Sequence, residues 1–192
     1  MKTIITAAKF MLVMMLITGL GYPLLISVVA KILFSDKAAG SLILRNGVVI
    51  GSELIGQNFT RPQYFWPRPS AIDYNPLPSG GSNLGPTSAA LRDSIAKRQA
   101  RLEAIHGRDK EIPNDLLLSS ASGLDPHISP GAARYQVDRI IKARNLDQTA
   151  KNSLYNLIDQ NTEYPTLGLL GDPRVNVLKL NLALDSLAEG SK

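Results

Sequence analysis

The residues of this chain best suited to act together chemically lie close in sequence, in the segment 122–127. Ser122, Asp125 and His127 are the residue types of a nucleophile, an orienting acid and a base. Catalytic triads are normally assembled from separate loops, because side chains so near along the chain rarely converge on one point. Gly123 and Asp125 are also typical turn residues. The pattern permits a hydrolytic site but favours a rigid turn, so we assign no catalytic residue.

Metal and phosphate chemistry have weaker support. The chain has no cysteine and its only histidines are His106 and His127, so a zinc site would need carboxylates at unusual spacing. The segment Ser79–Ser88 has glycines at the spacing of a phosphate-binding loop, but Pro86 stands where the lysine should be. Proline also removes an amide donor from such a loop. We therefore expect a shaped turn, with no metal and no directly bound cofactor.

These segments must be positioned by the elements around them. A hairpin is predicted at residues 41–50, because Asn46 and Gly47 both tolerate positive φ and lie between two apolar runs. Residues 60–87 form a long Pro, Gly, Ser and Asn-rich segment that cannot be one regular element. Long ordered loops are usually functional. Its aromatic residues indicate that it packs against the rest of the domain: Tyr64, Phe65, Trp66 and Tyr74.

Helices are predicted from about Ser88 to His106, from the Ser129-Pro130 cap to Arg144, and from the cap at Asp147 to Gln160. In the first of them, apolar spacing leaves Arg98 and Arg101 on the solvent side. The alternating leucines of residues 175–184 predict a final strand. Strands at both ends with helices between them indicate an α+β fold.

An uncharged run of 21 residues, Phe10–Ala30, precedes this domain. As a helix it would be roughly 31 Å long, about the hydrocarbon thickness of a bilayer. A cleaved signal peptide is the rival interpretation, but its apolar core is usually shorter, about 7–15 residues. We predict a retained transmembrane helix at residues 10–34. Gly19, Gly21 and Pro23 in mid-span favour packing against partner helices.

The transmembrane helix divides the chain into a short arm, residues 1–9, and a single soluble domain, residues 35–192. Positive charges are nearly balanced on the two sides, so orientation rests on the short arm and long domain: we expect a cytoplasmic arm and an extracytoplasmic domain. Without the two lysines of the arm, the formal net charge falls from +5 to +3. That charge is too small to suggest nucleic acid.

Short motifs that together suggest a family are spread along the whole chain. They are Gly21–Leu24 in the span, then Gly51-Ser52, Leu54–Gln57, Phe59, Tyr64-Phe65, Arg68–Ala71, Tyr74-Asn75, Ser79–Pro86, Ala121–Pro126, Gln136, Arg139, Ala143-Arg144, Gly171, Pro173–Leu178 and Leu180-Asn181. In these motifs, and in their order, the sequence resembles the C subunit of the bacterial Kdp potassium-transporting ATPase.

The resemblance implies a non-catalytic accessory subunit in the bacterial inner membrane. Its partners would be a channel-like potassium-binding subunit, a P-type ATPase catalytic subunit and a very small single-span subunit, with ATP and K⁺ used by the complex. The C subunit is described as a catalytic chaperone that raises the ATP affinity of the ATPase subunit. Because an extracytoplasmic domain cannot touch cytoplasmic ATP, we expect an indirect effect or a role beside the outer mouth of the channel.

The resemblance also nominates positions that belong to a partner interface or to the internal structure: Gln57, Arg68, Ser70, Tyr74, Asn75, Ser79, Gly80, Gly81, Ser82, Asn83, Gly85, Ser122, Gly123, Asp125, Gln136, Arg139, Arg144, Arg174 and Asn176. Their arginines suit bidentate bonds to a partner, or equally internal bonds that hold the irregular segment. Two other function classes stay open: a membrane-anchored hydrolase, and a binding module that uses residues 64–83 for recognition.

Overall fold

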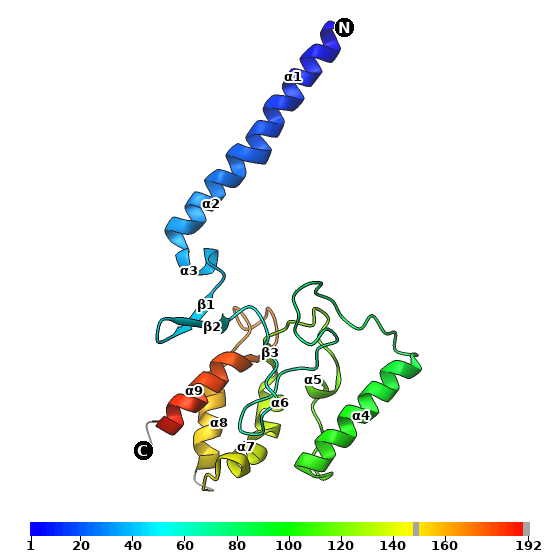
Figure 1. Ribbon diagram of the computed structural model, residues 1–192, viewed down its shortest axis with the longest axis vertical. Coiled ribbons are helices and arrows are strands. Elements are labelled where there is room, and N and C mark those ends of the chain that lie inside the picture. Colours follow the sequence, from blue (N-terminus) through cyan, green and yellow to red (C-terminus); the bar gives the residue numbers. More distant parts are fainter. Residues whose placement is uncertain (148–149, 190–192) are drawn as a thin grey trace. The chain divides into compact units, whose positions relative to one another are not determined.

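A long apolar helix and a hairpin make up the first of two structural units, residues 1–52, and the second begins at Glu53. The computed structural model describes residues 1–147 and 150–189, apart from the side chains of residues 188 and 189 (Figure 1).

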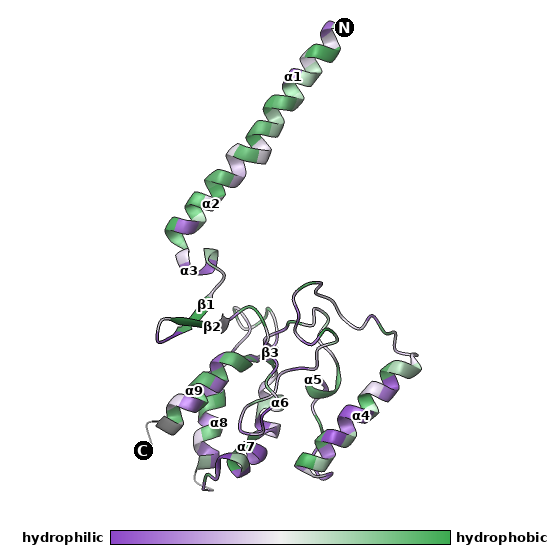
Figure 2. Cartoon of the chain, viewed as in Figure 1, coloured by the Kyte–Doolittle hydropathy of each residue, from purple (hydrophilic) through white to green (hydrophobic). Residues whose placement is uncertain are grey.

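The apolar helix consists of α1 (Lys2–Leu16), a π-helical segment (Ile17–Gly21) and α2 (Tyr22–Leu33). Together they form a 32-residue helix, long and apolar enough to cross a membrane, and apolar residues predominate along its length (Figure 2). The π-helical segment ends two residues before Pro23, which has no amide hydrogen and crowds the preceding turn, so a local widening is expected there.

The predicted hairpin is confirmed. After a single helical turn, α3 (Ser35–Ala38), strand β1 (Leu42–Arg45) pairs antiparallel with β2 (Val48–Ser52). Asn46 and Gly47 take φ values of 53° and 78°. Both residues therefore occupy the left-handed region that a tight two-residue turn requires.

The second unit is a mixed α/β structure. Its helices are α4 (Ala89–His106), α5 (Asn114–Leu117), α6 (Pro130–Tyr135), α7 (Val137–Arg144), α8 (Ala150–Gln160) and α9 (Val177–Glu189). Three short antiparallel strands form a sheet in the order β3 (His127–Ile128), β5 (Arg174–Asn176), β4 (Thr162–Glu163).

The core of this unit lies among α6 to α9 and the sheet, where α8 packs beside α7 and α9 (Figure 1). Its fully buried side chains include Ile140, Leu154, Ile158 and Leu180. Phe65, from the irregular segment, is also completely buried in this core. The expectation that the irregular segment packs against the domain is therefore confirmed.

Helix α4 matches its predicted range, and it ends at Gly107 with a φ of 85°. The cap at Asp147 is also confirmed, since the Ala150 amide donates to its Oδ1 at 3.0 Å. The solvent-side assignment of Arg98 was wrong. Its guanidinium is half-buried and donates to the Leu117 carbonyl at 2.7 Å and to Ser119 Oγ at 2.9 Å. The positively charged end of Arg98 thus ties α4 to the segment that follows α5.

The strand predicted at residues 175–184 was wrong for most of its length. Only Arg174–Asn176 is extended, and α9 begins at Val177. Val177, Leu180, Asn181 and Leu184 are buried, and this spacing of three and four residues is one face of a helix. The alternating leucines satisfied the strand period, but two of them, Leu180 and Leu184, also lie on this helical face.

The helix predicted from Pro130 to Arg144 is two helices. The N-terminal cap is confirmed, because Ser129 Oγ accepts from the Ala132 amide at 3.1 Å. The break falls at Gln136, whose φ and ψ are −86° and −10°. Its buried side chain is bonded to the irregular segment, so a tertiary contact coincides with the interruption.

Candidate functional site

The irregular segment between Glu53 and Ser88 is held in place by polar side chains from the C-terminal helices. The central one is Arg139 on α7, which is 7% exposed. Its Nη1 donates to the carbonyls of Pro62 and Tyr64, and its Nη2 donates to Gln136 Oε1 at 2.6 Å. The guanidinium also lies over the Trp66 ring, 3.8 Å from the ring centre. Burial and the charge of Arg101 lower the pKa of Arg139 to about 10, so it remains charged at neutral pH.

Two buried amides bind the backbone of the same segment. Gln136 accepts from the Trp66 amide at 2.7 Å and donates to the Trp66 carbonyl at 3.1 Å. Asn181 on α9 makes the equivalent pair of bonds with Phe65, at 2.8 Å and 3.0 Å. An amide side chain thus replaces the strand that would otherwise satisfy each backbone pair.

A third contact lies at the outer edge of this arrangement. Arg144 donates to the Gln63 carbonyl at 2.9 Å and to Asp185 at 2.7 Å. Tyr64 donates to the other oxygen of Asp185 at 3.2 Å. We call Gln136, Arg139, Arg144, Asn181 and Asp185 the loop clamp, because together they fix residues 62–66 on α7 and α9.

Sequence reasoning missed two members of the loop clamp, Asn181 and Asp185. The signal was available: both are polar residues within the leucine-rich stretch at the C-terminal end. Their role could not be recognised because the stretch was interpreted as a strand. In a strand, Asn181 falls on the side opposite the leucines. Helical spacing instead places Asn181 beside the buried Leu180 and Leu184.

A second cluster holds the middle of the irregular segment against residues 120–125. Arg68 forms an ion pair with Asp125 at 3.2 Å, and the Tyr74 hydroxyl donates to the Arg68 carbonyl. Ser70 Oγ donates to the Gly123 carbonyl at 2.8 Å. Burial raises the pKa of Tyr74, and the charge of Asp125 raises it further. Its phenol therefore stays neutral and able to donate.

Ser122, Asp125 and His127 serve this cluster as turn residues. Asp125 Oδ1 accepts from the His127 amide at 3.0 Å and lies 3.4 Å from His127 Nδ1. Ser122 Oγ instead accepts from the Leu124 amide at 3.1 Å and lies 3.2 Å from Ser120 Oγ. Burial alone would raise the pKa of Asp125, but hydrogen bonds from His127 and the charge of Arg68 outweigh burial and lower it. The carboxylate is thus held charged between Arg68 and His127.

The glycines of this region allow two backbones to approach closely. The Gly80 amide donates to the Ser122 carbonyl at 3.1 Å. A Cβ on Gly81 would lie 2.7 Å from the Ala121 carbonyl oxygen, and Gly123 combines a φ of 70° with a similar obstruction by Ile72. Asn75 stabilises the turn by accepting from the Leu77 amide at 3.2 Å. Ser79, Ser82, Asn83 and Gly85 are exposed, whereas Gln57 is half-buried. The segment Ser79–Ser88 is thus a shaped turn whose outer residues face solvent.

Asn176 and Arg174 lie on β5. Asn176 donates to the Glu53 carbonyl at 2.8 Å and caps the start of α9 by accepting from Lys179 at 3.1 Å. Arg174 pairs with Glu163 across the sheet at 3.0 Å. Within the described residues, no group of three or more His, Cys, Asp or Glu side chains is placed to hold a metal ion.

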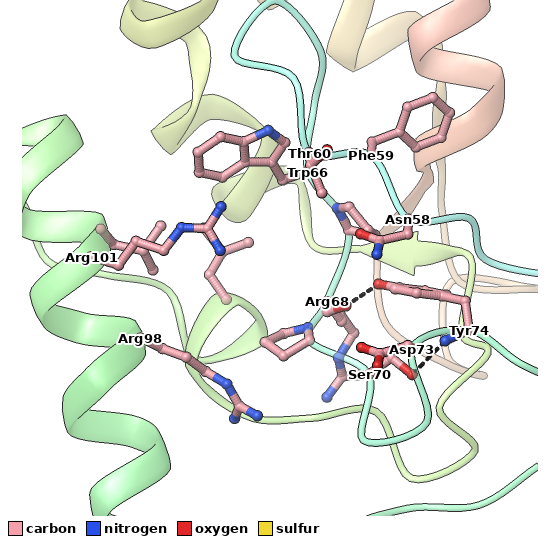
Figure 3. Close-up of a pocket in the computed structure, with 14 residues that line it drawn as sticks. Asn58, Phe59, Thr60, Trp66, Arg68, Ser70, Asp73, Tyr74, Arg98 and Arg101 are labelled. Atoms are coloured by element: carbon pink, nitrogen blue, oxygen red, sulfur yellow. Dashed lines mark hydrogen bonds between the residues drawn. The ribbon is translucent and has the colours of Figure 1, made fainter.

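A cleft of about 300 Å³ lies between the irregular segment and α4 (Figure 3). Arg101 reaches from α4 to within 5.0 Å of the Trp66 ring centre, on which Arg139 also packs. Behind Trp66, the His106 ring lies 4.5 Å from the Tyr135 ring. Burial, and then the charges of Arg139 and Lys110, lower the pKa of His106 to about 4. The half-buried His106 is therefore neutral at physiological pH.

The family model "K+-transporting ATPase, c chain", KdpC, matches residues 4–186. The chain belongs to the KdpC family. A potassium-transporting ATPase KdpC subunit of Polaromonas naphthalenivorans is 52% identical over 192 residues, covering 97% of this chain and 96% of the relative. The KdpC subunit of Paraburkholderia phytofirmans is 51% identical and covers 91% of each chain. That of Dechloromonas aromatica is 46% identical, covering 98% of this chain and the whole of the relative.

The KdpC resemblance inferred from the motifs is therefore confirmed. The structure adds what several of the motif residues do: Gln136, Arg139 and Arg144 are bonded within the chain, to residues 62–66. As a KdpC subunit of a potassium-transporting ATPase with one apolar N-terminal helix, the chain is a single-pass membrane protein with an accessory role in potassium uptake.

Proposed function

We propose that this KdpC subunit is a non-catalytic support for an ATP-driven potassium pump, and that it acts through a rigid folded unit without binding ATP or K⁺ itself. The observation that carries the proposal is the loop clamp, because it commits five charged and amide side chains of the second unit to internal bonds. Three of the polar positions singled out by the motifs, Gln136, Arg139 and Arg144, bind their own backbone. Such a unit is built to keep a surface in a fixed shape.

The partners we propose are a channel-like potassium-binding subunit, a P-type ATPase subunit and a small single-span subunit. The relatives described above are named as subunits of a potassium-transporting ATPase. Their names support assembly with such partners. Gly19, Gly21 and Pro23 would pack against partner helices in the bilayer. Gly19 and Gly21 lie within the π-helical segment, and such small residues allow close approach of helices.

We further propose that the exposed turn Ser79–Gly85 is the part of the irregular segment that meets a partner. Its inner side is fixed by Gly80 and Gly81 against residues 121 and 122, whereas Ser82, Asn83 and Leu84 are exposed. Asn83 has a φ of 52°, so its side chain is presented from a tightly constrained backbone. An anchored turn loses little conformational entropy on binding.

The orientation we propose places residues 1–9 in the cytoplasm of the bacterial cell and the second unit outside the inner membrane. In that arrangement any effect on ATP use is indirect and passes through the assembled membrane helices.

Reconstitution tests the function. The pump subunits should show potassium-dependent ATP hydrolysis with this chain and lose it without the chain, while the chain alone hydrolyses no ATP. Asn83→Ala should leave thermal unfolding unchanged and weaken co-purification with the pump, and Asn152→Ala, on the exposed side of α8, is the matched control. Binding of ATP to the purified chain at micromolar concentration would contradict the proposal.

Protease accessibility tests the orientation. Protease added to the outer face of spheroplasts should degrade the second unit. Protection from outside with cleavage from the cytoplasmic side would reverse the orientation and make direct contact with ATP feasible.

A further inference from the structure

A tight turn between β4 and β5 presents bulky apolar side chains to solvent. Leu167 is 87% exposed, Leu169 86%, Tyr164 70% and Leu170 67%. Elsewhere in the described part of the second unit, large apolar side chains of this exposure are isolated, for example Leu77. We call residues 164–170 the leucine turn. Four neighbouring apolar side chains at this level of exposure are a contact surface that solvent alone does not explain.

The leucine turn has a defined backbone. Thr166 and Leu170 form a β-bridge, with the Thr166 amide donating to the Leu170 carbonyl at 3.0 Å and the Leu170 amide to the Thr166 carbonyl at 3.1 Å. The Gly168 amide donates to the Pro165 carbonyl at 2.9 Å, and the Leu169 amide to the Thr166 carbonyl at 3.2 Å. Four amides of the turn, those of Thr166, Gly168, Leu169 and Leu170, are thus paired within it, which lowers the cost of moving this backbone into a medium with little water.

The chemistry of the turn matches a bilayer interface. Residues 164–171 carry no charge, and the charged residues begin on either side, at Glu163 and Asp172. Tyr164 stands at the base of the turn, and tyrosine is enriched at the level of lipid headgroups because its ring is apolar and its hydroxyl polar. No lysine or arginine lies in the turn, so its attraction would be to hydrocarbon and not to anionic headgroups.

The first residue of the second unit is bonded to the same strand from which this turn projects. The second unit starts at Glu53, only 19 residues (34–52) after α2 ends. Glu53 is bonded to β5 and α9, through the Asn176 amide at 2.8 Å and Lys179 at 2.8 Å. The leucine turn begins at the other end of the same three-residue strand, beyond the Glu163 and Arg174 pair. The turn and the first residue of the second unit are therefore separated by the length of one three-residue strand.

We propose that the leucine turn is a second membrane contact, which inserts Leu167, Leu169 and Leu170 into the interfacial region of the bilayer that the apolar helix spans. Two attachments, one through the helix and one through the turn, would fix the tilt of the second unit on the membrane surface.

Labelling at single cysteines tests this inference, and the absence of cysteine from the chain makes the test clean. The full chain with Leu169→Cys, labelled with an environment-sensitive fluorophore, is reconstituted into phosphatidylcholine vesicles that contain nitroxide-labelled lipid. We expect blue-shifted emission and strong quenching by the lipid nitroxide. The matched control is Asp109→Cys, at an exposed position after α4, which should emit as in water and escape quenching.

Adding Leu167→Glu and Leu170→Glu to the Leu169→Cys chain should lower the ratio of inserted to exposed turn by at least tenfold, about 1.4 kcal/mol, and return the label to the control signal. Emission of the unmodified Leu169→Cys chain equal to that of the control would overturn the proposal. So would a label that stays in water in vesicles and becomes shielded only when the other pump subunits are added, since the turn would then meet protein. Because the vesicle measurement uses this chain alone, its failure is separate from any failure of the pump reconstitution.

Discussion

Removing the side chain of Arg139 is the sharpest test of the loop clamp. Arg139→Ala deletes bonds to the carbonyls of Pro62 and Tyr64 and to Gln136, and also the contact with the Trp66 ring. A hydrogen bond from a charged donor contributes about 1.5–3 kcal/mol, and a cation over an aromatic ring about 0.5–2 kcal/mol. These terms are not additive. Removing the donor leaves the Pro62 and Tyr64 carbonyls without this partner, at about 1–3 kcal/mol each, so we expect the free energy of unfolding to fall by about 3–5 kcal/mol.

The measurement uses the single tryptophan of the chain. Because Trp66 lies against Arg139, its fluorescence reports on the clamped segment itself. In urea titrations of the full chain in detergent, Arg139→Ala should lower the midpoint by roughly 2 M, taking about 1–3 kcal/mol per molar urea as the usual slope. The Trp66 emission should also move towards that of solvent-exposed tryptophan.

Two variants control this experiment. Arg134→Ala removes another arginine nearby in sequence, which pairs with Asp159 at 2.5 Å but is half exposed, so we expect a change of at most about 1 kcal/mol. Arg139→Lys keeps the charge but loses the planar fork that reaches two carbonyls, so its loss should be intermediate. An Arg139→Ala chain with unchanged midpoint and unchanged Trp66 emission would refute the clamp, and lost co-purification in that chain would make Arg139 an interface residue.

Three further predictions follow from the same contacts. Although leucine is more apolar, Asn181→Leu should destabilise the second unit by about 2–4 kcal/mol in urea titrations, because the Phe65 amide and carbonyl lose their buried partner. The control Asn152→Leu, at an exposed position, should have little effect. Equal urea midpoints for the two variants would contradict this prediction. Gly81→Ala should lower the free energy of unfolding by about 1–3 kcal/mol, since the added Cβ meets the Ala121 carbonyl. Gly85→Ala has open space around its Cβ and should be nearly neutral. Equal thermal midpoints for the two variants would contradict this prediction. Because the folded pKa of His106 is about 4 and the unfolded value about 6.5, the unfolded chain binds the proton first, and stability should fall as pH drops from about 6.5 towards 4. His106→Phe should reduce that slope in urea midpoints measured at intervals between pH 7.5 and 4.5, and an unchanged slope would show that His106 is not its source.

Local patterns were sufficient for elements whose stability is local. The hairpin at Asn46 and Gly47, the helix ending at Gly107, and the caps at Ser129 and Asp147 all formed as predicted. Each depends on backbone conformations or hydrogen bonds available within a few residues. The apolar helix is similarly determined by composition, and the motif order was sufficient to recognise the family.

Local patterns failed where distant segments compete for the same residues. Residues 177–184 satisfied a strand period and a helical period equally well, and the helix formed because it buries Leu180 and Leu184 while turning Asn181 towards Phe65. The break at Gln136 has the same origin, since its side chain is bonded to Trp66, 70 residues away in sequence. Neither partner can be identified from spacing along the chain.

The sequence by itself determined the membrane helix, the hairpin, helices α4 and α8 and the membership of the KdpC family, because these rest on composition, short-range geometry and motif order. Only the tertiary structure decided what the polar motif residues bind. A guanidinium such as that of Arg139 has the same donors whether it meets a partner protein or a carbonyl of its own chain. The choice is made by which unpaired backbone groups the fold brings within reach, and here the irregular segment supplies them at Pro62 and Tyr64.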